Sequence, residues 1–307
     1  LYCGATVDFV DIDPESWCLS TVRLSEKLKL HQERKLPLPK VVIAVHLSGQ
    51  SCDMASIADL GRRYGFKIIE DASHAIGGRY RDAPVGDCTY SDITVFSFHP
   101  VKIITTGEGG MLVVKDEDIA SQVPMLRHNG HCSFPFERED YWIPAMGNLD
   151  FPQLENDFLW PNNFCLGEIE CALGDKLLDR IDSINQKKRD RAIMFIDALS
   201  NFSELEFHRV HSTRHNYHLL AAKLNGGKRD EFIRKMAIEK KIQCVVQYYP
   251  LNRYPLYQKA GFGNADCPQA DDFFDNMVSF PFHHSLSSEE LDYILQSTKD
   301  VLKELQN

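Results

Sequence analysis

The chain of 307 residues lacks the sequence features of several protein classes. No uninterrupted apolar stretch approaches the ~20 residues of a membrane-spanning helix, so we expect no membrane partner. Its nine cysteines form no C-x-x-C pair, which favours a reducing, cytoplasmic compartment over a disulfide framework. Basic residues are the minority, 34 Lys and Arg against 44 Asp and Glu, so we expect no nucleic-acid partner.

Two phosphate-binding loops are also missing. No G-x-G-x-x-G follows a strand and no G-x-x-x-x-G-K-S/T occurs, which excludes a Rossmann dinucleotide site and a P-loop NTPase. Apolar residues make up 43% and charged residues 25%, as in folded globular proteins. The length suggests roughly two domains.

The hydrophobic pattern predicts an α/β protein. In the first half, short β-branched runs alternate with amphipathic stretches, which is typical of a mostly parallel sheet. The expected strands are residues 7–12, 41–46, 66–71, 93–98 and 111–114, and the expected helix is 54–64.

The second half predicts a long helix and a smaller α+β unit. Apolar residues at helical spacing cover 164–199, a helix with at most one break. A strand, a helix and a strand are expected at 217–224, 229–239 and 244–249. Ser287 and Glu290 form a capping box that opens a helix reaching Leu305. We place the domain boundary on the long helix, giving domains 1–183 and 184–307.

Two residues near strand ends indicate chemistry. Asp71 ends an apolar run, and a carboxylate at the carboxyl end of a parallel strand faces the crevice where α/β proteins bind ligands. It could instead cap the following turn. Lys102 lies between an apolar strand and a glycine-rich turn, where desolvation would lower its pKa and free the amine to attack a carbonyl. A solvated loop lysine is the alternative.

Several segments resemble a known family, the DegT/StrS-type sugar aminotransferases that depend on pyridoxal 5'-phosphate (PLP). The sequence motifs are most similar to those of UDP-4-amino-4,6-dideoxy-N-acetyl-beta-L-altrosamine transaminases. The resemblance implies a fold-type I PLP-dependent transferase, with a large domain built on a mostly parallel sheet and a smaller α+β C-terminal domain. The matching segments are 70–77, 97–102 and 106–110, supported by 10–13, 46–50 and 279–283.

The resemblance also implies roles for five residues. Lys102 would hold PLP as a Schiff base and move the proton. Asp71 would pair with the pyridine nitrogen so that the ring acts as an electron sink. His74 would pack near the ring, Ser97 would bind the cofactor phosphate, and Asn163 would reach the cofactor phosphate of a neighbouring subunit in a homodimer.

The chain departs from the family pattern in two places. Cys165 stands where the family usually has an Arg near the substrate phosphate. The family also carries a further N-terminal segment, with a Ser-Gly-Thr phosphate cradle and an aromatic residue that stacks on the ring. We therefore expect this chain to be a fragment.

The implied activity is transfer of an amino group, with glutamate as donor, to a keto sugar that is nucleotide-linked, in glycan or polysaccharide biosynthesis. One alternative is a keto-cyclitol aminotransferase, and another is a non-catalytic truncated paralogue. A PLP sugar dehydratase is disfavoured because such relatives have His at the position of Lys102.

Other clusters carry weaker signals. His208, His211, His215 and His218 are spaced as on one helix face, but their segment has poor helix propensity, so we expect solvated loop histidines and no metal site. The aromatic stretch 248–257 is consistent with a sugar pocket or with interdomain packing.

Overall fold

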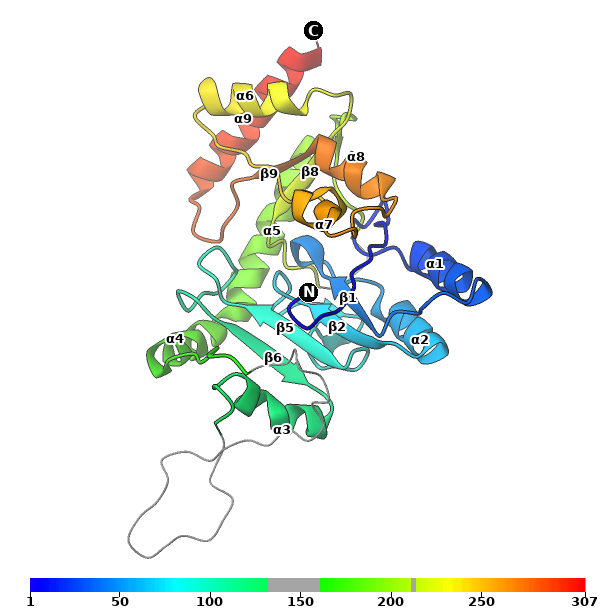
Figure 1. Ribbon diagram of the computed structural model, residues 1–307. Helices are drawn as coiled ribbons and strands as arrows, with labels where there is room; N and C mark the ends of the chain where they lie inside the picture. The colour runs from blue at the N-terminus through cyan, green and yellow to red at the C-terminus, as the bar shows by residue number, and fades with distance from the viewer. Residues whose placement is uncertain (132–160, 211–213, 307) are drawn as a thin grey trace, which may run out of the picture.

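The computed structural model describes residues 1–131, 161–210 and 214–306. A larger part contains a four-stranded sheet, and a smaller part lies above it in Figure 1. The large sheet has the order β1-β2-β5-β6, in which the first three strands are parallel and the last is antiparallel. Its strands are β1 (Val41–Val45), β2 (Lys67–Asp71), β5 (Ile93–Ser97) and β6 (Gly110–Val114). The mostly parallel sheet predicted from the sequence is confirmed.

One predicted strand of the large domain is wrong. Residues 7–12 form no strand, and Ile12 makes only an isolated bridge with Leu19. The reason is Asp11, which is 4% exposed and accepts hydrogen bonds from the backbone N–H groups of Gln269 and Ala270. These amides open helix α8 (Pro268–Asn276), so this segment caps a helix instead of joining the sheet.

Helices α1 (Thr21–Glu33) and α2 (Met54–Tyr64) pack together on the β1 side of the large sheet (Figure 1). Helix α2 spans the predicted residues. Asp53 caps its start by accepting a hydrogen bond from the N–H of Ser56, and Gly65 ends it with a φ of 80° that favours glycine. Ile57 of α2 is fully buried in a core that includes Ala44 of β1.

The remaining elements of this part are short. They are the 3-10 helix η1 (Leu47–Gly49), the hairpin β3 (Arg79–Tyr80) and β4 (Ala83–Pro84), and helices α3 (Glu117–Leu126) and α4 (Glu168–Leu178).

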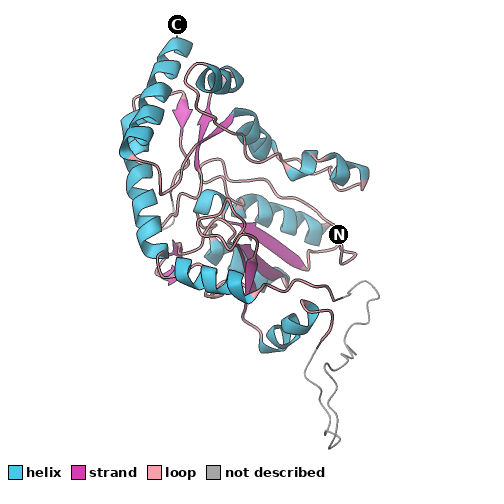
Figure 2. Cartoon of the chain, turned by 90° about the vertical axis from the view of Figure 1, so that its left-hand side faces the viewer, coloured by secondary structure: helices cyan, strands magenta, loops and turns pink. Residues whose placement is uncertain are grey.

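Helix α5 (Ile181–Leu199) follows α4 after a break at Asp179 and Arg180, which confirms a long helical stretch with one break. It runs from the large sheet to the small part of the molecule, as Figures 1 and 2 show. The boundary between residues 183 and 184 stays a prediction.

The small part has a three-stranded antiparallel sheet of order β7-β8-β9, packed against α5, α6 and α9. The expected strand at 217–224 is β8, and the expected strand at 244–249 is wrong because Val245 makes only an isolated bridge with Ser279. The elements are β7 (Leu205–Glu206), β8 (Leu220–Leu224), α6 (Arg229–Ile238), η2 (Leu251–Arg253), α7 (Pro255–Lys259), β9 (Met277–Phe280) and α9 (Ser288–Gln306).

None of the helices within the described residues combines the length and apolar character that a bilayer crossing requires.

The predicted capping box before α9 is present. The Ser287 hydroxyl accepts a hydrogen bond from the N–H of Glu290 at 3.1 Å, and the Glu290 carboxylate accepts one from the N–H of Ser287 at 2.7 Å. We expect Ser287→Ala to lower the free energy of unfolding by about 1 kcal/mol, measured by urea denaturation. Ser288→Ala, at the exposed next position, is the control, and an equal loss in both variants would contradict the capping role.

Candidate active site

The predicted site residues lie at the carboxyl ends of two adjacent parallel strands. Asp71 is the last residue of β2 and pairs with Val95, two positions before Ser97, the last residue of β5. Lys102 follows β5 in a tight turn, in which its own N–H donates to the carbonyl of His99 at 2.9 Å. Because β2 and β5 run in the same direction, their ends bring the carboxylate and the amine to one edge of the sheet.

The Lys102 amine and the Asp71 carboxylate influence each other electrostatically. Lys102 is half-buried, and desolvation lowers its pKa, while the negative charge of Asp71 acts in the opposite direction. A lysine with a lowered pKa is unprotonated for a larger fraction of the time and is the better nucleophile toward a carbonyl. The solvated-loop alternative for Lys102 is therefore disfavoured.

His74 belongs to the same cluster. It is 7% exposed, and burial followed by the charge of Lys102 lowers its pKa to about 4, against an opposing effect of Asp71. Its ring packs against His218, with centroids 4.2 Å apart, and against Tyr248 at 5.9 Å. Its buried Nδ1 atom has no hydrogen-bond partner among the described residues, so His74 retains one polar atom for a ligand.

Buried contacts fix the backbone on both sides of Asp71. Glu70 is 5% exposed, and its carboxylate lies 2.9 Å from Nε2 of the fully buried His46. The turn after His74 approaches α5 so closely that a Cβ on Gly77 would lie 2.6 Å from the Asn185 amide nitrogen. Asn185 in turn donates a hydrogen bond to the carbonyl of Ile76 at 3.0 Å. These contacts hold the end of β2 and its turn against the interdomain helix.

Ser97 and Asn163 are the two remaining predicted site residues, and only Ser97 lies on a strand that carries the Lys102 cluster. Ser97 is partly exposed at the end of β5, and its hydroxyl accepts a hydrogen bond from the N–H of His99. Asn163 is exposed on a segment that pairs with His128, and no described contact joins it to Asp71, His74 or Lys102. Its assignment to the site of a neighbouring subunit stays a prediction.

Two residues that the sequence did not assign to the catalytic cluster contact His74. The Tyr248 hydroxyl lies 3.4 Å from His74 Nε2, and His218 stacks on its ring. Tyr248 falls in the aromatic stretch expected to line a sugar pocket or to pack between domains. His218 carried no such signal.

The expectation of solvated loop histidines is wrong for the three that the structure describes. His208, His215 and His218 are all less than 10% exposed. His208 and His215 lie with their Nε2 atoms 2.6 Å apart beside Trp17 and Tyr217, and His218 belongs to the His74 cluster. The described residues 215–218 are held against the large part of the molecule, where the N–H groups of Asn216 and His218 donate to the carbonyls of Gly49 and Ser48. His211 lies outside the described residues, and no group of three or more metal-ligand side chains gathers within the described ranges.

Burial of these histidines makes stability depend on pH. Desolvation lowers the pKa of His218 to about 2 from an ordinary 6.5. Between these two values the unfolded chain binds a proton at His218 and the folded chain does not. Stability is therefore complete above pH 6.5 and falls as the pH falls toward 2. We expect His218 to contribute a loss of about 2 kcal/mol between pH 6.5 and pH 5.

Urea denaturation at both pH values tests this with His218→Phe, which keeps an aromatic ring and removes the titration. The variant should lose less stability than the wild-type protein over this interval. Equal losses would contradict the assignment.

The comparison with known proteins decides the family. A family model described as the DegT/DnrJ/EryC1/StrS aminotransferase family matches residues 1–299. The chain belongs to the DegT/DnrJ/EryC1/StrS aminotransferase family. The resemblance found in the segments around Asp71 and Lys102 is confirmed, and with it the fold-type I architecture.

Three similar proteins show the breadth of this aminotransferase family. The chain is 29% identical to the spore coat polysaccharide biosynthesis protein SpsC of Bacillus subtilis, over 99% of this chain and 75% of that protein. It is 26% identical to a UDP-4-amino-4,6-dideoxy-N-acetyl-beta-L-altrosamine transaminase of Campylobacter jejuni, over 99% and 76%. The solved structure of the putative sugar aminotransferase Spr1654 from Streptococcus pneumoniae, in its PMP-form, matches with a TM-score of 0.77 and 26% identity, over 99% and 76%.

The cofactor of this family is PLP, and the residues at the strand ends fit it. Lys102 offers a half-buried amine with a lowered pKa, and Asp71 offers a carboxylate close to it. His74 offers an unpartnered ring nitrogen in the same cluster. The expected roles of Lys102, Asp71 and His74 at the ring and aldehyde of PLP are compatible with these features, and these roles and that of Ser97 at the phosphate stay predictions.

Proposed function

We propose that this aminotransferase transfers an amino group from glutamate to a nucleotide-linked keto sugar in glycan or polysaccharide biosynthesis. The observation that carries the proposal is the Lys102 amine, half-buried at the carboxyl edge of a parallel sheet and electrostatically coupled to Asp71. Membership of an aminotransferase family supports it. The names of two relatives, one in polysaccharide biosynthesis and one acting on a UDP-linked amino sugar, support the proposal of a nucleotide-linked sugar.

Lys102, Asp71 and His74 have different roles in the proposed reaction. PLP, when bound, supplies an electron sink for the carbanion formed on the amino donor. Lys102 holds the cofactor and afterwards moves a proton at its Nζ atom, because its lowered pKa lets the amine act as a base. Asp71 holds a positive charge on the pyridine nitrogen. His74 stays neutral above a pH of about 4, so it can hydrogen-bond the ring without adding charge.

We also propose a cytoplasmic homodimer with shared sites. Asn163 is exposed and outside the Lys102 cluster, a position that suits a residue reaching a neighbouring subunit. Asn163→Ala in one subunit would then impair the site containing its partner's Lys102. Mixed dimers of Asn163→Ala and Lys102→Ala chains should retain about half of the active sites, and full inactivity would contradict sharing.

The proposed activity is tested in two half-reactions. Glutamate added to the PLP-loaded protein should shift the cofactor absorbance and release 2-oxoglutarate. The protein that now holds the amino form of the cofactor is then mixed with a panel of UDP- and GDP-linked 4-keto-6-deoxy sugars, an unlinked keto sugar and a keto cyclitol. It should react with a nucleotide-linked keto sugar. Reaction with only the cyclitol would contradict the proposal that the substrate is a sugar. No reaction with any amino donor would favour the alternative of a non-catalytic paralogue.

A further inference from the structure

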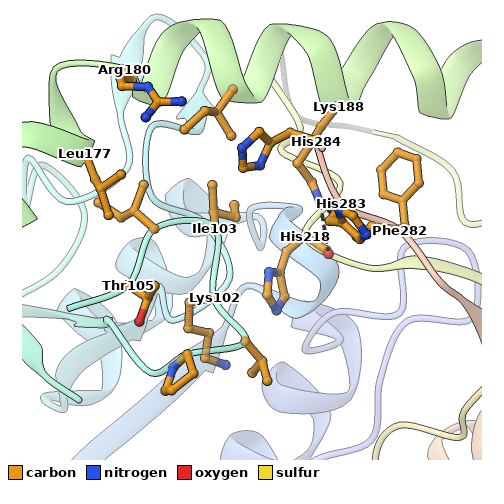
Figure 3. Close-up of a pocket in the computed structure, with 14 residues that line it drawn as sticks. Lys102, Ile103, Thr105, Leu177, Arg180, Lys188, His218, Phe282, His283 and His284 are labelled. Carbon is orange, nitrogen blue, oxygen red and sulfur yellow. Dashed lines mark hydrogen bonds between the residues drawn. The ribbon is translucent and has the colours of Figure 1, made fainter. Parts of the chain in front are cut away.

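A cavity of about 370 Å³ lies beside Lys102, between the turn that carries this lysine, helix α5 and the loop after β9 (Figure 3). Its volume is in the range of small-molecule sites. Lys102 and His218 line one side, and Arg180 and Lys188 of the helical stretch line the opposite side (Figure 3). The cavity therefore joins the catalytic amine to the interdomain helix.

Three basic side chains line this cavity, namely Lys102, Arg180 and Lys188. Three histidines line it as well, His218, His283 and His284, and burial keeps His218 neutral by lowering its pKa to about 2. None of the described residues that line it is an Asp or a Glu. Asp71 opposes the charge of Lys102 from outside the lining, but no acid lines the cavity beside Arg180 and Lys188, so the positive potential there attracts anions.

Lys188 is the most deeply buried of the basic residues that line the cavity. It is 4% exposed, and its side chain runs from α5 toward His218 and Phe282 (Figure 3). Its Nζ atom lies 3.4 Å from the carbonyl oxygens of His218 and Phe282, and 4.7 Å from the centroid of the Phe282 ring. It forms no ion pair with any carboxylate in the described residues. Two carbonyl oxygens and the Phe282 ring offset part of the cost of burying this ammonium, but its charge is not neutralised, so a bound anion would be stabilised beside it.

Burial lowers the pKa of Lys188 to about 8. The amine is therefore mostly protonated at neutral pH, and an anion bound nearby would raise its pKa again. The adjacent position on α5, Lys187, is exposed. This difference in burial separates a lysine that faces the cavity from one that faces water.

We propose that the cavity binds an anionic group of a substrate, a carboxylate or a phosphate, with the Lys188 ammonium as its buried counter-charge. The inference rests on the proposed function, which places the reacting end of that substrate at Lys102. The anionic group belongs either to the far carboxylate of the amino donor or to the phosphates of the nucleotide sugar. Arg180, which is exposed at the edge of the cavity, attracts the same group.

Binding measurements on the PLP-loaded protein test the proposal without any turnover. The probes are glutarate, a dicarboxylate that lacks the reacting amine, and UDP, which lacks the keto sugar. Calorimetry should show that Lys188→Met weakens one or both by about 10- to 100-fold, the range for a lost hydrogen bond to a charged group. Lys187→Met, the matched control, should change neither by more than about twofold, since exposed charges are screened.

The arms of the test separate the two sources. Weaker glutarate binding alone assigns the cavity to the donor carboxylate, and weaker UDP binding alone assigns it to the nucleotide. The proposal is overturned if Lys188→Met binds both probes like the wild-type protein, or if wild-type protein binds neither at millimolar concentration. Failure of the proposed function is distinguishable, because glutamate would then leave the cofactor absorbance unchanged while the probes still bound.

Folding is controlled separately. Met matches the length of the lysine stem and leaves no buried charge, so Lys188→Met should unfold within a few degrees of the wild-type protein. If it does not fold, Lys188→Gln tests the same position with a neutral side chain that can still donate to the carbonyls of His218 and Phe282. Weaker binding of a probe by Lys188→Gln supports the proposal, and unchanged binding of both overturns it.

Discussion

Lys102→Ala should abolish covalent retention of PLP and lower the rate of amino transfer by ~10²–10⁴-fold or more, the contribution of a positioned acid–base group. The residue holds the cofactor and also moves the proton, so other lysines of the chain do not replace it. The surrounding fold should survive, because the side chain is only half-buried and donates no described hydrogen bond from its Nζ atom. Melting temperatures should therefore stay close to wild type.

The measurement is mass spectrometry after borohydride reduction and dialysis, with stopped-flow absorbance for the glutamate half-reaction. Wild-type protein should carry the mass of reduced PLP on the peptide containing Lys102, and Lys102→Ala should carry none. Lys259→Ala, an exposed position on α7, is the control and should behave as wild type. An unchanged mass increment in Lys102→Ala would remove this lysine from the mechanism.

The part of the site that was predictable from the sequence is local. Asp71 ends β2 and Lys102 lies in the turn after β5, and the parallel arrangement of β2 and β5 brings their carboxyl ends to one edge. The hydrophobic pattern predicts where these two residues lie, whereas their expected roles came from the resemblance to the DegT/StrS-type family. The capping box at Ser287 and the start of α2 at Asp53 are similarly local.

The rest of the site depends on contacts between distant segments. Tyr248 reaches His74 across 174 positions, and Lys188 contacts the carbonyl of Phe282 across 94. Neither residue carries a local pattern that distinguishes a buried contact from a surface position. The burial of the histidines is also a long-range effect, since the ring of His218 packs against that of His74 from the large part of the molecule.

The wrong strands also have tertiary causes. The segment 7–12 is rich in β-branched and aromatic residues like a strand, but Asp11 accepts hydrogen bonds from the first turn of α8, more than 250 positions away. Residues 244–249 bond to β9 through Val245, which exchanges hydrogen bonds with Ser279, and through the N–H of Gln247, which donates to Met277 Sδ, but they form no continuous strand. Both segments make specific long-range contacts of this kind, which β propensity does not encode.

Asp71→Asn should lower kcat by ~10²–10³-fold, the loss expected when a preorganised charge is removed from the place where it stabilises the transition state. The amide keeps the size of the side chain and can still accept the hydrogen bond from the N–H of Ser73, which measures 3.0 Å. The Glu70 and His46 pair, which fixes the end of β2, is also unchanged. The fold and the position of residue 71 are therefore preserved while its charge is lost.

Asp92→Asn is a matched control. Asp92 precedes β5 at the amino ends of the parallel strands, away from Asp71, and pairs there with Lys67 at 2.8 Å. It should lower stability by less than about 1 kcal/mol and leave kcat unchanged. A second control replaces PLP with its N1-methylated form, which carries a positive ring nitrogen without a carboxylate. The methylated cofactor should narrow the gap between Asp71→Asn and wild-type protein, because Asp71 acts by holding that charge. An equal gap with both cofactors would show that Asp71 positions the ring instead of tuning its charge.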